Sequence, residues 1–186
     1  MNLQITLNQM LTELNETLSQ VSSEEADLLA EAILAANRVF ITGVGRSGLM
    51  VKGFAMRLTH MGFNVHAVGD VTTPAITADD LLVIGSGSGS TTSLRVITEK
   101  AKAVGSKIAM ITVLDNSPIA QMADIVLVLS APTLNRGKET AFTSVQPMGS
   151  LFEQSMLLTF DALIVMLMAK TKVNNDDMFV RHANLE

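Results

Sequence analysis

A loop made only of glycine and hydroxyl-bearing residues stands near the middle of this 186-residue chain. An aliphatic run ends at Gly85 and is followed by Ser86, Gly87, Ser88, Gly89, Ser90 and Thr91. Glycines let the backbone approach a ligand closely, and successive N–H groups at the start of a helix bind anions. The hydroxyl groups add further donors. The loop predicts a site for a small anion; the alternative is a flexible turn that caps a helix.

A single terminal phosphate is the anion that suits this loop. A nucleotide-binding loop of the G-x-x-x-x-G-K-[ST] type would place a lysine after the glycines, and none follows here. The 13 basic residues are scattered along a chain of net charge −5. A phosphate would therefore be held by local neutral donors. The scattered charge also argues against sequence-independent nucleic-acid binding, which needs a basic face.

A second glycine-rich stretch, Gly43–Gly48 (GVGRSG), satisfies the dinucleotide fingerprint G-x-G-x-x-G. A dinucleotide site also requires an acidic residue that closes the second strand. Asp70 is the candidate, but it lies beyond that strand, and two helices precede the motif. The dinucleotide site is therefore the weaker hypothesis for this stretch.

The elements around these loops alternate between short apolar strands and helical patterns. Strands are expected at 38–43, 63–68, 80–86, 107–113 and 124–130. Helices are expected at 3–20, 22–37, 48–61, 91–104, 117–122 and 147–172, with a polar loop at 131–146 and a tail at 173–186. The alternation predicts an α/β fold, a three-layer α/β/α sandwich around a five-stranded parallel sheet. Both glycine-rich stretches would lie at the carboxyl ends of strands, where such sheets bind ligands.

Composition narrows the class further. With 48% hydrophobic and 17% charged residues, the chain is expected to form one globular domain. The absence of cysteine excludes disulfides, thiolate metal sites and cysteine nucleophiles. No secretory signal is apparent, so a cytoplasmic location is expected. The apolar stretch 155–169 contains Asp161, which favours a buried core helix over a membrane span.

Three motifs together resemble the sugar isomerase (SIS) domain family: GVGRSG (43–48), GSGSGST (85–91) and MGSLFEQ (148–154). The segments GDVTTPAI (69–76) and RHANLE (181–186) narrow the resemblance to the 6-phospho-3-hexuloisomerases. The resemblance covers essentially the whole chain and implies one flavodoxin-like SIS domain. It implies a cofactor-free isomerase that interconverts 3-hexulose 6-phosphate and fructose 6-phosphate, working after 3-hexulose-6-phosphate synthase in the ribulose monophosphate pathway. A dimer or tetramer with sites at subunit contacts is also implied.

The same resemblance assigns roles to individual residues. It implies that Ser47, Ser86, Ser88 and Thr91 hold the phosphate and that Glu153 is the catalytic base. Gly45, Arg46, Gly87, Gly89 and Ser90 complete the expected phosphate site. Arg46 would neutralise the phosphate or an enediolate, or else bind a structural carboxylate.

The chemistry needs one carboxylate that moves a proton between adjacent carbons. Glu153 stands in an apolar stretch near a helix start, where burial would favour proton uptake near neutral pH. From position alone, an exposed or Arg-paired Glu153 is an equal alternative. His182 is the candidate for proton transfer between oxygens, because histidine titrates near neutral pH; ordering the C-terminus is its alternative. His60 is held in reserve, and no histidine has the spacing of a metal site.

Two other functions stay open at this point. One is an isomerase of the same fold that acts on another phosphosugar. The other is a SIS module that binds a sugar phosphate without turnover. Sensors of that kind usually carry a DNA-binding domain, and the residues before the first strand leave no room for a helix-turn-helix.

Overall fold

One parallel sheet forms the centre of the computed structural model, which describes residues 2–131 and 144–185. Its strands are β1 (Val39–Gly43), β2 (Val65–Ala67), β3 (Leu81–Gly85), β4 (Lys107–Thr112) and β5 (Ile125–Val128), in the order β2-β1-β3-β4-β5. Every neighbouring pair is parallel. The central strands are buried on both faces, which explains why their sequences are continuous apolar runs.

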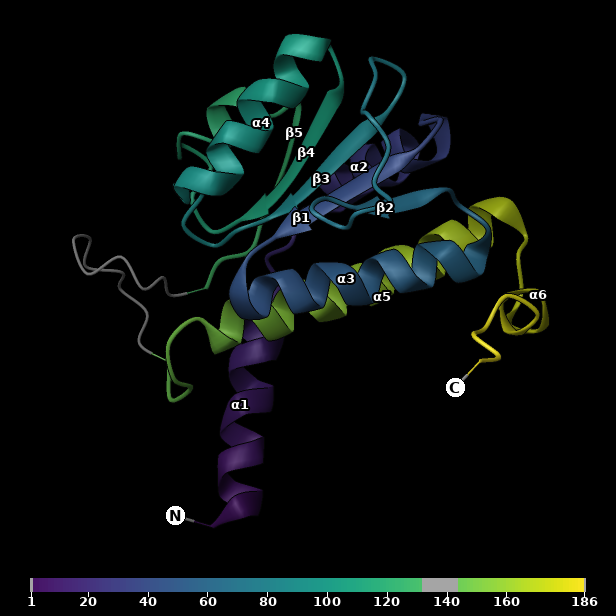
Figure 1. Ribbon diagram of the computed structural model, residues 1–186. Helices are drawn as coiled ribbons and strands as arrows, with labels where there is room; N and C mark the ends of the chain where they lie inside the picture. Colours follow the sequence, from purple (N-terminus) through teal and green to yellow (C-terminus); the bar gives the residue numbers. More distant parts are fainter. Residues whose placement is uncertain (1, 132–143, 186) are drawn as a thin grey trace.

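Helices cover both faces of this sheet (Figure 1). The helical elements of the described residues are α1 (Leu3–Leu18), α2 (Ser23–Ala35), α3 (Gly45–Met61), α4 (Thr92–Val104), the 3₁₀ segment η1 (Ala120–Met122), α5 (Ser150–Thr171) and α6 (Asn175–Phe179). Of these, α1 and α6 lie away from the sheet (Figure 1), where α1 contacts α5 and α6 contacts α3. Alternate strand residues face opposite cores: Ile41 and Val83 pack in the core with α2, α3 and α5, whereas Phe40 and Ile84 pack in the core with α4 and η1. The expected three-layer α/β/α sandwich is confirmed.

The strand order determines where a ligand can bind. The chain leaves β1 through α3 to reach β2 on one side, and then returns to place β3 on the other side of β1. The connections that leave the carboxyl ends of β1 and β3 therefore diverge to opposite faces. This is the topological switch point at which open α/β sheets bind ligands, and both glycine-rich stretches begin there.

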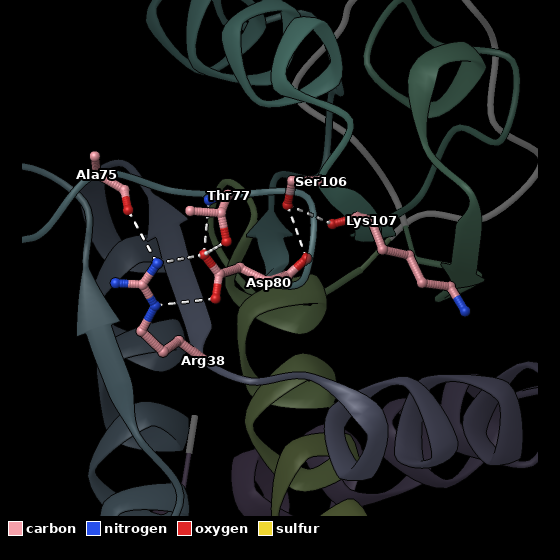
Figure 2. A network of polar contacts seen from close by, with 6 residues as sticks. All are labelled: Arg38, Ala75, Thr77, Asp80, Ser106 and Lys107. Atoms are coloured by element: carbon pink, nitrogen blue, oxygen red, sulfur yellow. Dashed lines mark hydrogen bonds and ion pairs between the residues drawn. The ribbon is translucent and has the colours of Figure 1, made fainter.

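The opposite, amino edge of the sheet is held by an ion pair whose carboxylate is buried (Figure 2). The Arg38 guanidinium, just before β1, donates to both carboxylate oxygens of Asp80, at 3.0 and 2.7 Å, and to the carbonyl oxygen of Ala75 at 3.1 Å. The Thr77 backbone and hydroxyl also donate to Asp80, at 2.7 and 2.9 Å. The Ser106 hydroxyl, just before β4, donates to the Asp80 carbonyl at 2.9 Å. These bonds join the starts of β1, β3 and β4, and they engage the family-like segment 69–76 at Ala75.

Some boundaries differ from the sequence expectation. The second strand is limited to Val65–Ala67, because it is an edge strand that pairs only with β1. The helix expected at 117–122 is a turn followed by the 3₁₀ segment η1. The expected tail contains α6, whose N-terminus is closed by a capping box between Asn174 and Asp177. Most of the loop expected at 131–146 lies outside the described residues.

Helix α5 is long and apolar enough to cross a membrane by length and composition alone. Half of its most apolar window is buried inside the protein. It packs beside α3, and it also contacts α1 and α2. Residues such as Met156, Phe160 and Leu163 belong to the main core, so tertiary packing accounts for the apolar character of this helix.

Candidate active site

Three α-helices begin at the switch point, and none of them has a side-chain cap. The positions before α3, α4 and α5 are Val44, Thr91 and Gly149, and no side-chain cap bond forms at any of them within the described part of the chain. By contrast, an Asn or Ser side chain caps each of α1, α2 and α6. Uncapped N–H groups and the positive end of the helix dipole both favour an anion. The uncapped ends therefore converge on a position whose donors and dipoles favour an anion.

A pocket of about 530 Å³ lies between these helix ends. One wall comes from the start of α3 and the β3–α4 loop, and the other from the segment that leads into α5. The polar lining residues are Arg46, Ser47, Ser86, Ser88, Thr91, Ser150 and Glu153, together with the glycines Gly45, Gly85, Gly87 and Gly149. The structure thus brings together residues that are more than 100 positions apart in the chain.

The serines of the β3–α4 loop are arranged to donate hydrogen bonds. The Ser86 Oγ accepts from the Gly89 N–H at 3.3 Å, and the Ser88 Oγ accepts from the Ser90 N–H at 3.4 Å. Since each oxygen is already an acceptor, each hydroxyl proton remains able to donate to a ligand. This is the donor arrangement that a phosphate needs.

Glycine is required at two places around this pocket. A Cβ on Gly48 would lie 2.6 Å from the Gly43 carbonyl oxygen, so glycine allows α3 to pack directly on β1. Gly89 has φ +57° and no room for a Cβ beside the Ser117 side chain. The fingerprint-like spacing of Gly43–Gly48 is therefore explained by close helix–strand packing and by the turn into α3.

The acidic side of the pocket is an ion pair. Arg46 Nη1 donates to Glu153 Oε2 at 2.9 Å and to Ser150 Oγ at 2.8 Å. The Glu153 side chain is 16% exposed and the Arg46 side chain 47% exposed. The alternative of an Arg-paired Glu153 is thus realised, and the pair itself lines the pocket. A carboxylate and a guanidinium stand side by side where a ligand would bind.

Not every residue predicted for the site lines it. Gly89 and Ser90 are outside the lining set. Gly89 is buried against the Ser117 side chain, and Ser90 is exposed. The backbone N–H groups of both residues instead donate to the loop serines, so they shape the loop from behind.

His182 lies at the other end of α3 from the pocket of its own chain. Its ring centroid is 5.3 Å from that of His60, which precedes the last residue of α3. Since α3 has 17 residues, its two ends are about 25 Å apart. Figure 1 shows α6 and the C-terminus beside the end of α3, away from its start. Burial first, then the charges of Arg57 and His182, lower the pKa of His60.

Sequence reasoning missed part of the pocket wall. Met148, Ser150 and Phe152, which precede the expected base Glu153 in the chain, also line the pocket. Their signal was present in the MGSLFEQ motif, because Ser150 stands three residues before Glu153 on one face of the helix. Within residues 2–131 and 144–185, no group of three or more His, Asp or Glu side chains is placed to hold a metal ion.

Comparison with known proteins assigns the family. The SIS domain model matches residues 32–166, which include both glycine-rich loops and Glu153. The chain belongs to the SIS domain family. In this SIS domain, the matched region contains the five strands and α5 as far as residue 166.

Individual relatives extend the similarity beyond the SIS domain itself. The chain is 45% identical over 178 residues to a Bacillus subtilis protein named 3-hexulose-6-phosphate isomerase, with 96% of each chain covered. It is 41% identical to a Mycobacterium gastri protein of the same name, covering 94% of this chain and 86% of the relative. A Methanococcus jannaschii crystal structure, for which a molecular function of 3-hexulose-6-phosphate isomerase was inferred, superposes with a TM-score of 0.82 at 33% identity. That alignment covers 99% of this chain and 98% of the other.

Proposed function

We propose that this protein interconverts 3-hexulose 6-phosphate and fructose 6-phosphate. The observation that carries the proposal is a single pocket in which an uncharged anion cradle faces the Arg46–Glu153 pair. The relatives named 3-hexulose-6-phosphate isomerase match nearly the whole chain, not one segment of it. An isomerase of a phosphosugar needs both halves of this pocket.

The phosphate is bound by the first half. The uncapped starts of α3 and α4 supply N–H groups, and Ser47, Ser86, Ser88 and Thr91 supply hydroxyl donors. Preorganised neutral donors at helix ends hold a phosphate monoester without a metal ion. The sugar carbons then extend across the pocket toward α5.

Glu153 moves the proton in the second half. The reaction takes a proton from C2, passes through a 2,3-enediolate and returns a proton to C3. One carboxylate on one face of the substrate serves both carbons, first as base and then as acid. A 3-hexulose 6-phosphate could close only to strained four-membered rings, so it enters as the open chain and requires no ring opening.

Arg46 stabilises charge on the oxygens. The guanidinium carries five N–H donors, and it spends two contacts on Ser150 and Glu153. The remaining guanidinium donors of Arg46 can reach the enediolate oxygen, while its bond to Glu153 keeps that carboxylate oriented. Donors aimed at developing charge supply a large part of many rate enhancements.

His182 acts in the pocket of another subunit in this proposal. Its distance from its own pocket is about the length of α3, so a proton-transfer role requires an oligomer with shared sites, a dimer or a tetramer. Leu3, Ile5, Leu7 and Leu11 of α1 are exposed apolar residues, which supports a homo-oligomer. We further infer a cytoplasmic enzyme that works after 3-hexulose-6-phosphate synthase in formaldehyde fixation.

The experiment couples the two reactions. Ribulose 5-phosphate, formaldehyde and 3-hexulose-6-phosphate synthase are mixed with this protein, and fructose 6-phosphate is measured. Glu153→Gln is expected to lower turnover ~10²- to 10⁴-fold, the usual contribution of an acid–base group. Asp161→Asn is the matched control, because Asp161 is an exposed acid on the same helix.

The alternatives have distinct outcomes in the same experiment. No fructose 6-phosphate with the intact protein would refute the proposed substrate, and a panel of other phosphosugars would then test for a different isomerase. Tight binding of the panel without turnover would indicate a sensing module. Equal turnover of Glu153→Gln and the intact protein would remove Glu153 from the mechanism.

A further inference from the structure

Glu13 is a buried carboxylate on the N-terminal helix that the proposed reaction does not use. It is 8% exposed, in the half of α1 that packs against α5. Burying a charged group is costly unless it is paired or hydrogen-bonded. The partners of Glu13 therefore indicate what its burial achieves.

Within the part of the chain that the structure describes, three donors to the Glu13 carboxylate come from one short segment, residues 144–146. The Val145 backbone N–H donates to Oε1 at 2.7 Å. The Ser144 hydroxyl and the Gln146 side-chain amide donate to Oε2, at 2.7 and 3.0 Å. Burial alone would raise the pKa of Glu13, but these bonds together lower it, so the carboxylate is held in its charged form.

The bound segment continues directly into the pocket. The Gln146 N–H donates to Ser144 Oγ at 3.0 Å, and Gln146 Oε1 accepts from the Gln154 side chain of α5 at 2.6 Å. The next residues, Pro147–Ser150, line the pocket and lead to Glu153. Glu13 thus fixes both the approach to α5 and, through Gln146, the residue that follows the expected base.

We propose that Glu13 is a positioning residue that holds the Pro147–Glu153 wall of the pocket at the distance the proton transfer requires. The bonds among Glu13, residues 144–146 and Gln154 form the Glu13 clamp. Among the described residues, no hydrogen bond joins this clamp to the phosphate half of the pocket in the β3–α4 loop, which is bonded instead to β4 through Ser86 and Gly87. The clamp therefore acts on the chemical step and leaves phosphate binding unchanged. This inference rests on the proposed isomerase function.

The test compares Glu13→Ala and Glu13→Gln with Glu16→Gln. Glu16 is exposed on the same helix, so its variant removes one negative charge without touching the clamp. In Glu13→Gln an NH2 group replaces one of the two acceptor oxygens, so at least one of the three bonds to residues 144–146 is lost whichever way the amide is oriented. The readouts are kcat for 3-hexulose 6-phosphate, the inhibition constant of inorganic phosphate, and amide hydrogen exchange of residues 144–152.

We expect both Glu13 variants to lose ~10- to 100-fold in kcat, the scale of an ångström-sized misplacement of reacting groups. The phosphate inhibition constant is expected to stay within about twofold of that of the intact protein, and exchange of 144–152 to accelerate. Glu16→Gln should match the intact protein in all three. A general loss of folding would weaken phosphate binding as well, which would overturn the proposal.

A variant outside α1 keeps the proposal testable if the Glu13 variants prevent α1 from folding. Gln146→Met removes the link between Glu13 and Gln154 from the loop side and should reproduce the loss in kcat. Unchanged kcat and unchanged exchange in these variants would refute the clamp. If the intact protein does not isomerise 3-hexulose 6-phosphate, the proposed function fails, and hydrogen exchange alone still decides whether Glu13 holds the segment.

Discussion

Arg46 Nη1 lies 2.9 Å from Glu153 Oε2 and 2.8 Å from Ser150 Oγ, so one guanidinium joins the start of α3 to the start of α5. Helices α3 and α5 pack side by side, and the Arg46–Glu153 ion pair joins them at the end that faces the pocket. The pair explains how a partly buried carboxylate is tolerated there, because its charge is compensated by a partner that is itself nearly half exposed. Substrate would meet a charge pair that is already formed.

Arg46→Lys should impair the reaction although the substitution keeps the positive charge. A lysine carries its donors on a single nitrogen, so it cannot hold Ser150 and Glu153 while a separate nitrogen donates to an enediolate oxygen, as the planar fork of arginine can. Losing one charge-assisted hydrogen bond, about 1.5–3 kcal/mol, should lower kcat/KM ~10- to 100-fold. Steady-state kinetics with fructose 6-phosphate measures this, with Lys100→Gln, an exposed α4 charge, as the control. Wild-type kinetics in Arg46→Lys would mean that charge alone suffices.

Gly89→Ala should destabilise the fold more than Gly45→Ala. The two glycines have nearly the same φ, +57° and +59°, but a Cβ meets the Ser117 side chain at Gly89 and open space at Gly45. Backbone strain of about 1–2 kcal/mol is common to both, so the difference in free energy of unfolding isolates the steric contact. Urea denaturation measures it.

The double variant Gly89→Ala with Ser117→Gly provides the check on that comparison. Removing the Ser117 side chain should bring the loss of stability back toward that of Gly45→Ala. Equal destabilisation by the two single variants would show that the Ser117 contact relaxes without cost.

The Asp80–Arg38 ion pair should make stability depend on acid pH. The hydrogen bond from Arg38 lowers the pKa of Asp80 below its usual 3.8, and the Thr77 bonds act in the same direction against burial. Since the folded-state pKa lies below the unfolded value, the stabilisation is complete above that value and is lost as pH falls through the folded-state pKa. Free energies of unfolding measured by denaturant titration from pH 7 to pH 3 should therefore decrease.

Asp80→Asn tests the same ion pair directly. Removing one partner of a fully buried pair costs about 3–5 kcal/mol, and since the Arg38 side chain is 18% exposed, the loss in Asp80→Asn should be smaller than this. The variant should also lose part of the acid dependence. Asp79→Asn is the matched control, because Asp79 is the exposed neighbour. An equal effect of the two substitutions would contradict a stabilising role for the Asp80–Arg38 ion pair drawn in Figure 2.

Shared sites can be tested by mixing two inactive variants. If His182 completes the pocket of another subunit, Glu153→Gln and His182→Asn should each be nearly inactive alone. Co-expressed in equal amounts, they should regain about a quarter of wild-type activity, because mixed dimers carry one intact site in two. Size-exclusion chromatography verifies the mixed oligomer. Continued inactivity of the mixture would place His182 outside the neighbouring site.

Much of the fold was predictable from local pattern. Apolar runs that end at Gly43 and Gly85 predicted the central strands, and the glycine and serine spacing singled out the two loops that line the pocket, because each signal lies within a few consecutive residues. The family-like MGSLFEQ motif pointed to Glu153 as the expected base, and the structure places Glu153 in the pocket lining. Element boundaries differed from the prediction where packing decides them, as in the short edge strand β2 and in η1.

The sequence by itself therefore determined the α/β class, the two glycine-rich corners and the acidic residue that faces them. Only the tertiary structure decided that Arg46 pairs with Glu153, that His182 lies at the far end of α3, and that Glu13 binds the segment before α5. These contacts join residues 107 to 133 positions apart or depend on the length of a helix. Local propensity carries no information on such pairs, because they form only when the sheet order brings distant helix ends to one edge.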